Sequence, residues 1–252
     1  MTPTIPGSPF DLDKALVDLG KDRFGHYTSV VTLGSQDVTE TGEYDVATRR
    51  YQLEKRVSTP DGAYVFHVRH LGKDASYVSY VQRADPGGQV SCWARIRDRA
   101  VREAKRANGI DFAIAPLPGP LVSLLSLETA GAERVGDVVH ANEDAYLGLT
   151  LLGIGEPALQ PIAGLIDGHL VPIDVHVAGD GHINGADVDG RSVRDALAAD
   201  GVDLPSATAN SLPLMRSTLE IDRLGTPVAV VAPPASDVVP LDDQWDSCHL
   251  PR

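Results

Sequence analysis

From residue 26 to about residue 97 the chain alternates apolar and polar residues in short runs that turn residues separate. Successive side chains of a β-strand point to opposite faces, so strict alternation predicts strands with one buried face. Residues 59–62 (Thr-Pro-Asp-Gly) and 85–88 (Asp-Pro-Gly-Gly) have the composition of reverse turns. The segment therefore predicts an antiparallel meander, which restricts the rest of the fold more than any other feature.

The expected elements follow from this alternation and from helical spacing. Strands are expected at 26–33, 38–46, 51–57, 64–71, 75–82, 89–96, 134–141, 143–152, 170–177 and 215–222, with 227–231 completing a closing hairpin. Helices are expected around residues 12–19, where leucines recur at nearly helical spacing, and at 97–108, 118–127 and 192–199. Residues 156–166 are broken by Gly and Pro, and we expect a short helix or a loop there.

We find no fixed-period repeat and no linker long enough to separate two domains, so we expect one ligand-binding domain over residues 1–252. The expected class is α+β, with a large curved antiparallel sheet, a half-barrel or open barrel, wrapped around a few helices. Residues 1–10 and 233–252 are expected to be extended arms. Narrow leucine stripes in 118–127 and 192–199 predict loose packing and a hydrophobic cavity between these helices and the sheet.

The net charge of −13 over 252 residues argues against nucleic acid and against an anionic membrane surface. No run approaches the ~20 apolar residues that cross a bilayer. The cysteines Cys92 and Cys248 are too far apart for a zinc or redox motif, and they form either one disulfide in an exported protein or two thiols in a reducing compartment. The first ten residues lack a basic segment and an apolar run, so we expect a cytoplasmic protein with free thiols. If a signal peptide was removed, an exported protein of the cell envelope is expected instead.

No motif of a hydrolase, kinase or dehydrogenase is present, and we expect neither cofactor nor metal. Asp174 and His176 are spaced two apart on an expected strand, so both point to one face, where an acid and an imidazole can perform acid–base chemistry. His67 and Arg69 form a similar pair. A solvated outer face is the simpler interpretation of both pairs.

Candidate ligand contacts are aromatic side chains of the strands and leucines of the middle helix, and most of them are also expected to serve as core. They are Tyr44, Tyr51, Tyr64, Phe66, Tyr77, Trp93, Leu121, Leu125 and Tyr146. A cluster of basic residues at 95–106, which includes Arg102, is a candidate for holding an acidic head group, although a solvated helix face explains it as well.

A likeness to a known family is carried by residues 41–45 with the following Tyr51, and by residues 68–78, 170–177, 180–183, 217–222, 225–228 and 232–234. Together they resemble the LppX/LprG-type lipoproteins of actinobacteria, which belong with the LolA/LolB-like half-barrel carriers. The resemblance implies a twisted sheet that wraps helices, with lipid chains in the space between. The family's export signal and acylated cysteine have no counterpart in this sequence.

Two functions follow from these observations. The first is a cytoplasmic enzyme, a cofactor-independent cyclase of the polyketide or antibiotic type. It would hold a hydrophobic substrate in the cavity and promote ring closure or cycloaddition by controlling its conformation. The alternative is an LppX/LprG-like lipid or lipoglycan carrier of the cell envelope. In both cases the expected partner is a small hydrophobic or amphipathic molecule, and the oligomeric state stays open.

Overall fold

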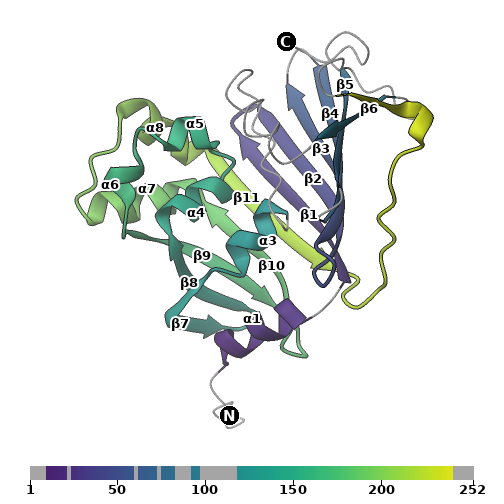
Figure 1. The fold of residues 1–252 in the computed structure, drawn as a ribbon. Helices are drawn as coiled ribbons and strands as arrows, with labels where there is room; N and C mark the ends of the chain where they lie inside the picture. Colours follow the sequence, from purple (N-terminus) through teal and green to yellow (C-terminus); the bar gives the residue numbers. More distant parts are fainter. Residues whose placement is uncertain are drawn as a thin grey trace.

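A computed structural model describes residues 10–21, 24–59, 62–72, 75–82, 92–96 and 118–240. These residues form one twelve-stranded sheet with the strand order β12-β6-β5-β4-β3-β2-β1-β11-β10-β9-β8-β7 (Figure 1). Every neighbouring pair is antiparallel except β12 and β6, which run parallel. The sheet curves without closing and carries several helices, so the expected α+β class with an open, half-barrel sheet is confirmed.

The strands are β1 (Phe24–Leu33), β2 (Gln36–Asp45), β3 (Arg50–Thr59), β4 (Gly62–Leu71), β5 (Ser76–Gln82), β6 (Trp93–Ile96), β7 (Glu128–Val135), β8 (Val138–Asp144), β9 (Leu170–Val177), β10 (Ile183–Asp189), β11 (Met215–Asp222) and β12 (Val238–Pro240). The helices are α1 (Leu12–Lys21), α3 (Gly119–Leu124), α4 (Ala145–Leu151), α5 (Glu156–Leu159), α6 (Ala163–Ile166), α7 (Gly190–Ala199) and α8 (Ser206–Ser211), with 3₁₀ turns η1 (Leu212–Leu214) and η2 (Ala235–Asp237). Among the described residues, no helix is long and apolar enough to cross a membrane.

The face of the sheet that carries the helices, called the inner face here, is marked by alternating burial along the strands. On β1 and β2, two tyrosines of this face lie against glycines of the opposite strand. Tyr27 is paired with Gly42, and Gly25 with Tyr44. A Cβ atom added to Gly42 would lie 2.5 Å from Cε1 of Tyr27. Glycine therefore leaves room for a large ring on the inner face, a device typical of strongly curved sheets.

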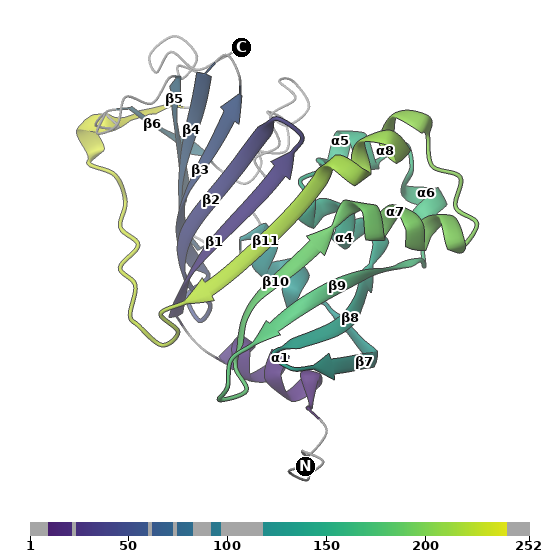
Figure 2. The same ribbon diagram turned by 180° about the vertical axis from the view of Figure 1, so that it is seen from behind.

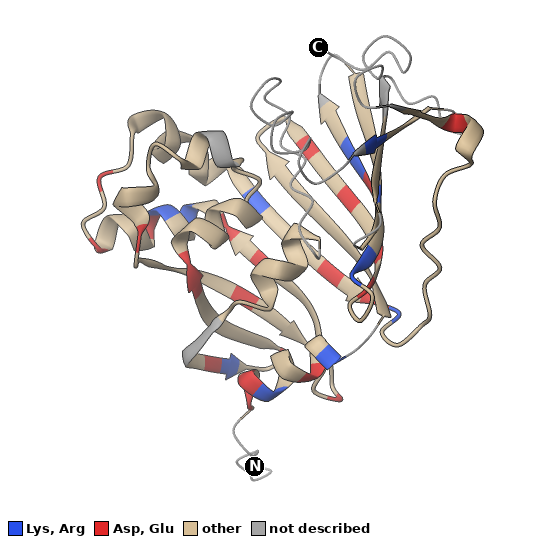
Figure 3. Cartoon of the chain, in the orientation of Figure 1, with Lys and Arg blue, Asp and Glu red and all other residues tan. Residues whose placement is uncertain are grey.

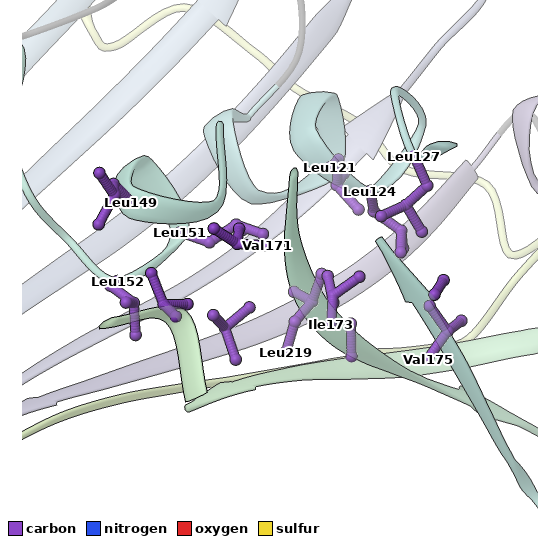
Figure 4. Packing of buried hydrophobic residues seen from close by; sticks show 14 of the residues in the cluster. Leu121, Leu124, Leu127, Leu149, Leu151, Leu152, Val171, Ile173, Val175 and Leu219 are labelled. Atoms are coloured by element: carbon purple, nitrogen blue, oxygen red, sulfur yellow. The ribbon is translucent and has the colours of Figure 1, made fainter. Parts of the chain in front are cut away.

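Helices cover the half of the sheet formed by β7 to β11, and strands β9 to β11 lie in front of α4 when the molecule is viewed from behind (Figure 2). Leucines of α3 and α4 belong to one buried cluster with Val171 and Ile173 of β9 and Leu219 of β11 (Figure 4). Val193 and Leu197 of α7 are fully buried in the same core. Helix α7 therefore packs its apolar side chains onto this half of the sheet.

The strand expected at 143–152 is wrong, because this segment forms α4. Asp144 caps the helix, since its side chain accepts hydrogen bonds from the backbone N–H groups of Tyr146 and Leu147. Gly148 faces β9, where a Cβ atom would overlap the side chain of Val171. Gly148 therefore permits close packing of the helix on the strand. The strand expected at 134–141 is also corrected, because Gly136, at a φ of 64°, turns the chain between β7 and β8.

The closing hairpin expected after β11 does not form. The chain turns at Arg223 and Gly225, whose φ angles are 50° and 75°, and continues without regular structure to η2 and β12. We call residues 223–237 the strap. Part of the expected C-terminal arm thus joins the sheet as β12, while residues 241–252, the N-terminal arm up to residue 9 and the helix expected at 97–108 lie outside the described residues.

Candidate functional site

A pocket of about 400 Å³ lies between the inner face of β1 to β4 and the helices α3 and α4. We call it the groove. Its second wall continues from α4 into Gly153, Ile154 and Gly155. The groove lies on strands β1 to β4, at the border of the half of the sheet that the helices cover. Helix α3 in Figure 1 marks its position.

Apolar side chains form most of both walls of the groove. Val31, Val38, Leu53 and Phe66 line it from four successive strands because their positions alternate toward the inner face. The opposite wall is made by Pro118 and Pro120 at the start of α3, Tyr146 and Leu151 of α4, and Ile154. An apolar lining of this kind is typical of sites for small hydrophobic molecules.

One ion pair interrupts the apolar lining. Glu40 and Lys55 are direct partners on β2 and β3, with Oε2 of Glu40 3.9 Å from Nζ of Lys55. The hydroxyl of Tyr27, which is fully buried, donates a 2.8 Å hydrogen bond to Oε1 of Glu40. The Glu40 side chain is only 14% exposed, whereas that of Lys55 is 46% exposed. The groove therefore contains a mostly buried carboxylate, held by Tyr27, next to a more exposed amine.

Two tyrosines beside this pair have perturbed acidity. Burial, and to a lesser extent the charge of Glu40, raise the pKa of Tyr27 well above its ordinary value. The same two causes raise the pKa of Tyr51, whose side chain lines the groove. Both phenols are therefore neutral at physiological pH. The hydroxyl of Tyr27 is engaged with Glu40, and that of Tyr51 is a hydrogen-bond donor in the groove wall.

The structure brings together three of the expected ligand contacts, Tyr51, Phe66 and Tyr146, around the groove. The other described candidates lie elsewhere. Tyr44 packs on Gly25, and Leu121 and Leu125 belong to the core and its margin. Tyr64 is on β4, outside the groove lining. Arg102 lies outside the described residues.

Tyr77 and Trp93 are on the outer face, opposite the groove. Tyr77 is paired with Arg69 and Arg95, and its buried neighbour Val78 takes the inner position. Trp93 contacts Arg69, whose guanidinium carbon is 4.7 Å from the ring centroid. Both aromatic residues are therefore excluded from the groove.

Glu40 and Lys55 were missed by sequence reasoning, although a signal was present. Glu40 is two residues from Val38 and four from Tyr44, so alternation alone places it on the inner face. The partner position of Lys55 depends on the register of β2 and β3, which the sequence does not state.

Asp174 and His176 share one face of β9, as the spacing predicts, but they lie on the outer face and do not form a pair with each other. Oδ1 of Asp174 is 2.7 Å from Nδ1 of His140 on β8. Nε2 of His176 is 3.4 Å from Asp187 on β10. These are half-exposed cross-strand contacts, which fit a solvated outer face.

Cys92 is disulfide-bonded in the structure. The expectation of free thiols is therefore wrong for this residue. The only other cysteine of the sequence, Cys248, lies outside the described residues. Within the described part of the chain, no group of three or more His, Cys, Asp or Glu side chains is arranged to hold a metal ion.

No protein-family model matches the chain, and no curated protein matches it at a significant level.

Proposed function

We propose that the protein binds a hydrophobic or amphipathic small molecule in the groove and acts as a carrier of that molecule, in the manner of the LppX/LprG-like proteins that its sequence resembles. The observation that supports this proposal best is the groove itself, with apolar walls and a volume of about 400 Å³. Ligand sites commonly measure ~300–1,000 Å³, so the groove suits one acyl chain or a molecule of similar size.

The disulfide of Cys92 favours a carrier in an oxidising compartment, because such bonds are rare in a reducing cytoplasm. The outer-face position of Asp174 and His176 also supports binding over catalysis, since neither side chain can reach a ligand in the groove through the sheet. The Glu40–Lys55 pair offers polar contacts to the head group of an amphipathic ligand.

A cyclase remains a second candidate, and Glu40 is the observation that favours it. A carboxylate of low exposure in an apolar groove can accept a proton from a bound substrate, and Tyr51 in the same wall can orient a carbonyl group. The walls would hold a flexible chain in a reactive shape, which in good intramolecular reactions lowers barriers by ~7–11 kcal/mol.

Binding is tested by titrating the protein with cis-parinaric acid, a fluorescent fatty acid, and by competition with unlabelled fatty acids. Thr150, an exposed residue of α4, lines the groove. The variant Thr150→Trp is expected to weaken binding at least about tenfold, equal to ~1.4 kcal/mol, because the indole fills the groove. Thr39→Trp is the matched control, since Thr39 lies on the outer face of β2. Equal affinities of the two variants would disprove binding in the groove.

Carrier and cyclase are distinguished by turnover. The protein is incubated with a linear hydrophobic polyketide-type precursor, and the products are separated by liquid chromatography and mass spectrometry. A carrier returns the compound unchanged. A cyclase converts it, and Glu40→Gln then slows the conversion of bound precursor.

A further inference from the structure

A second pocket, of about 600 Å³, lies on the other side of the sheet, between the strap and the outer face of β1 to β4. We call it the strap pocket. Arg223, Pro234 and Asp237 of the strap form one wall. Outer-face side chains of the strands form the other. The single layer of the sheet separates the strap pocket from the groove, and Leu53 and Val68 border both.

Hydrogen bonds already hold several polar groups of the strap pocket in place. Glu43 accepts a 2.9 Å hydrogen bond from Nε2 of Gln52 and lies 3.4 Å from Nη2 of Arg223. Nδ1 of His26 is 2.7 Å from Asp222, which orients the imidazole at the edge of the pocket. Groups that are fixed before binding lose little entropy when a ligand arrives.

Arg69 joins the strap to the sheet. Its guanidinium lies over the ring of Trp93, and Nη1 donates a 3.3 Å hydrogen bond to the carbonyl oxygen of Val231 in the strap. His67, beside it on the same face, is 3.7 Å from Oε2 of Glu54. The strap pocket is thus bounded by the planar guanidinium of Arg69, a hydrogen-bond donor, and by the neighbouring side chains of His67 and Glu54.

The charges of the lining are mixed and nearly balanced. Glu43, Glu54 and Asp237 oppose Arg69 and Arg223, while Thr41, Gln52 and two histidines add further polar groups. Three carboxylates disfavour a phosphate or another anion, and two guanidinium groups disfavour a polyamine. A sugar hydroxyl both donates and accepts, so a neutral polyhydroxylated molecule matches carboxylates, amide, hydroxyl and guanidinium groups at once. Figure 3 shows the interspersed charges along β2 to β4.

We propose that the strap pocket binds a neutral saccharide. This site is distinct from the groove and does not depend on the hydrophobic ligand proposed for it.

The experiment uses the intact chain with its disulfide. Maltotriose, mannotriose, cellotriose and chitotriose are titrated by calorimetry, with inorganic phosphate and spermidine as charged probes. At least one trisaccharide is expected to bind with a Kd of ~1 mM or tighter, and neither charged probe is expected to bind at that level. Failure of all four trisaccharides at ~10 mM, or binding of only phosphate or spermidine, would overturn the proposal.

Two variants then locate the site. Glu54→Gln and Thr41→Val remove a carboxylate and a hydroxyl from the lining with little change in shape. Each is expected to weaken the saccharide about tenfold, as loss of one well-made hydrogen bond does. Glu220→Gln is the control, because Glu220 is exposed on the outer face of β11 beyond the pocket. Thermal melting establishes folding, and a Kd that is unchanged in both folded pocket variants would refute binding there. Affinity for cis-parinaric acid is expected to stay constant in both variants, which separates this test from that of the groove.

Discussion

The ring of Tyr27 lies against Gly42 on the neighbouring strand. Its hydroxyl donates a 2.8 Å hydrogen bond to Glu40, which precedes Gly42 by two residues on the same strand. The same contact that accompanies the curvature of the sheet also places a polar group of the groove. Gly42 leaves space for the Tyr27 ring, and the hydroxyl of that ring holds the Glu40 carboxylate in the groove wall.

Gly42→Ala is expected to destabilise the protein by ~1–3 kcal/mol, because the new methyl group meets a fully buried ring that has little room to move. The free energy of unfolding is measured by urea denaturation. Gly164→Ala is the control, since a Cβ atom at this position of α6 meets nothing within 4 Å. The control is expected to be neutral or stabilising by up to ~1 kcal/mol. Similar losses in both variants would show that the contact of Tyr27 with Gly42 is not tight.

His67 predicts a dependence of stability on pH. Burial lowers the pKa of this imidazole below its ordinary value of 6.5, Arg69 lowers it further, and Glu54 opposes the shift. As the pH falls below ~6.5, the unfolded chain takes up a proton that the folded chain binds more weakly, so the free energy of unfolding decreases. His67→Gln is expected to reduce this slope between pH 7 and pH 5 and to leave the stability at pH 7.5 less changed. Identical slopes in urea denaturation series would contradict the expectation.

The disulfide of Cys92 predicts a loss of stability on reduction. Cys92→Ser is expected to cost ~2–5 kcal/mol of unfolding free energy, and a reducing agent is expected to lower the wild type to the same level. Thiol titration of the denatured, unreduced protein should find no free thiol. Two free thiols in that assay would instead support the cytoplasmic assignment.

Asp174 and His176 are expected to be dispensable for binding in the groove. Replacing either by Ala should change the affinity for cis-parinaric acid by less than about twofold, and stability by less than ~1 kcal/mol, because their cross-strand contacts are half exposed. A tenfold loss of affinity in a folded variant would show that the outer face acts on the groove.

Much of the sheet is predictable because alternation of period two is a local signal. The strands β9 and β11 coincide with the segments 170–177 and 215–222 that alternation indicates. The failure at α4 has a local cause as well. The spacing of its apolar residues fits both a strand, with a period of two, and a helix. The hydrogen bonds that Asp144 accepts as N-cap favour the helix. The expected closing hairpin is absent because Pro227, Pro233 and Pro234 have no backbone N–H group to donate to the hydrogen bonds between strands.

The candidate sites were harder to predict, because the face that a residue occupies depends on register and the neighbours of a strand depend on topology. Phe66 and Tyr146 are 80 positions apart and line the same groove only because α4 lies across it from β4. The strap pocket exists only because the strap crosses the outer face of the sheet, and no pattern of residues in the sequence predicts that course. Side chains such as Trp93 could therefore be identified as candidates but not assigned to a pocket.

The pairing of β1 with β11 has a kinetic consequence. His26 and Asp222, which meet at this seam, are 196 positions apart. The partner of β1 on this side leaves the ribosome only when most of the chain has been made. Until then the meander presents a ten-residue strand with an unsatisfied edge to its surroundings. Completion of the seam is a long-range event of the kind that slows folding, so we expect the nascent chain to aggregate most readily just before β11 emerges.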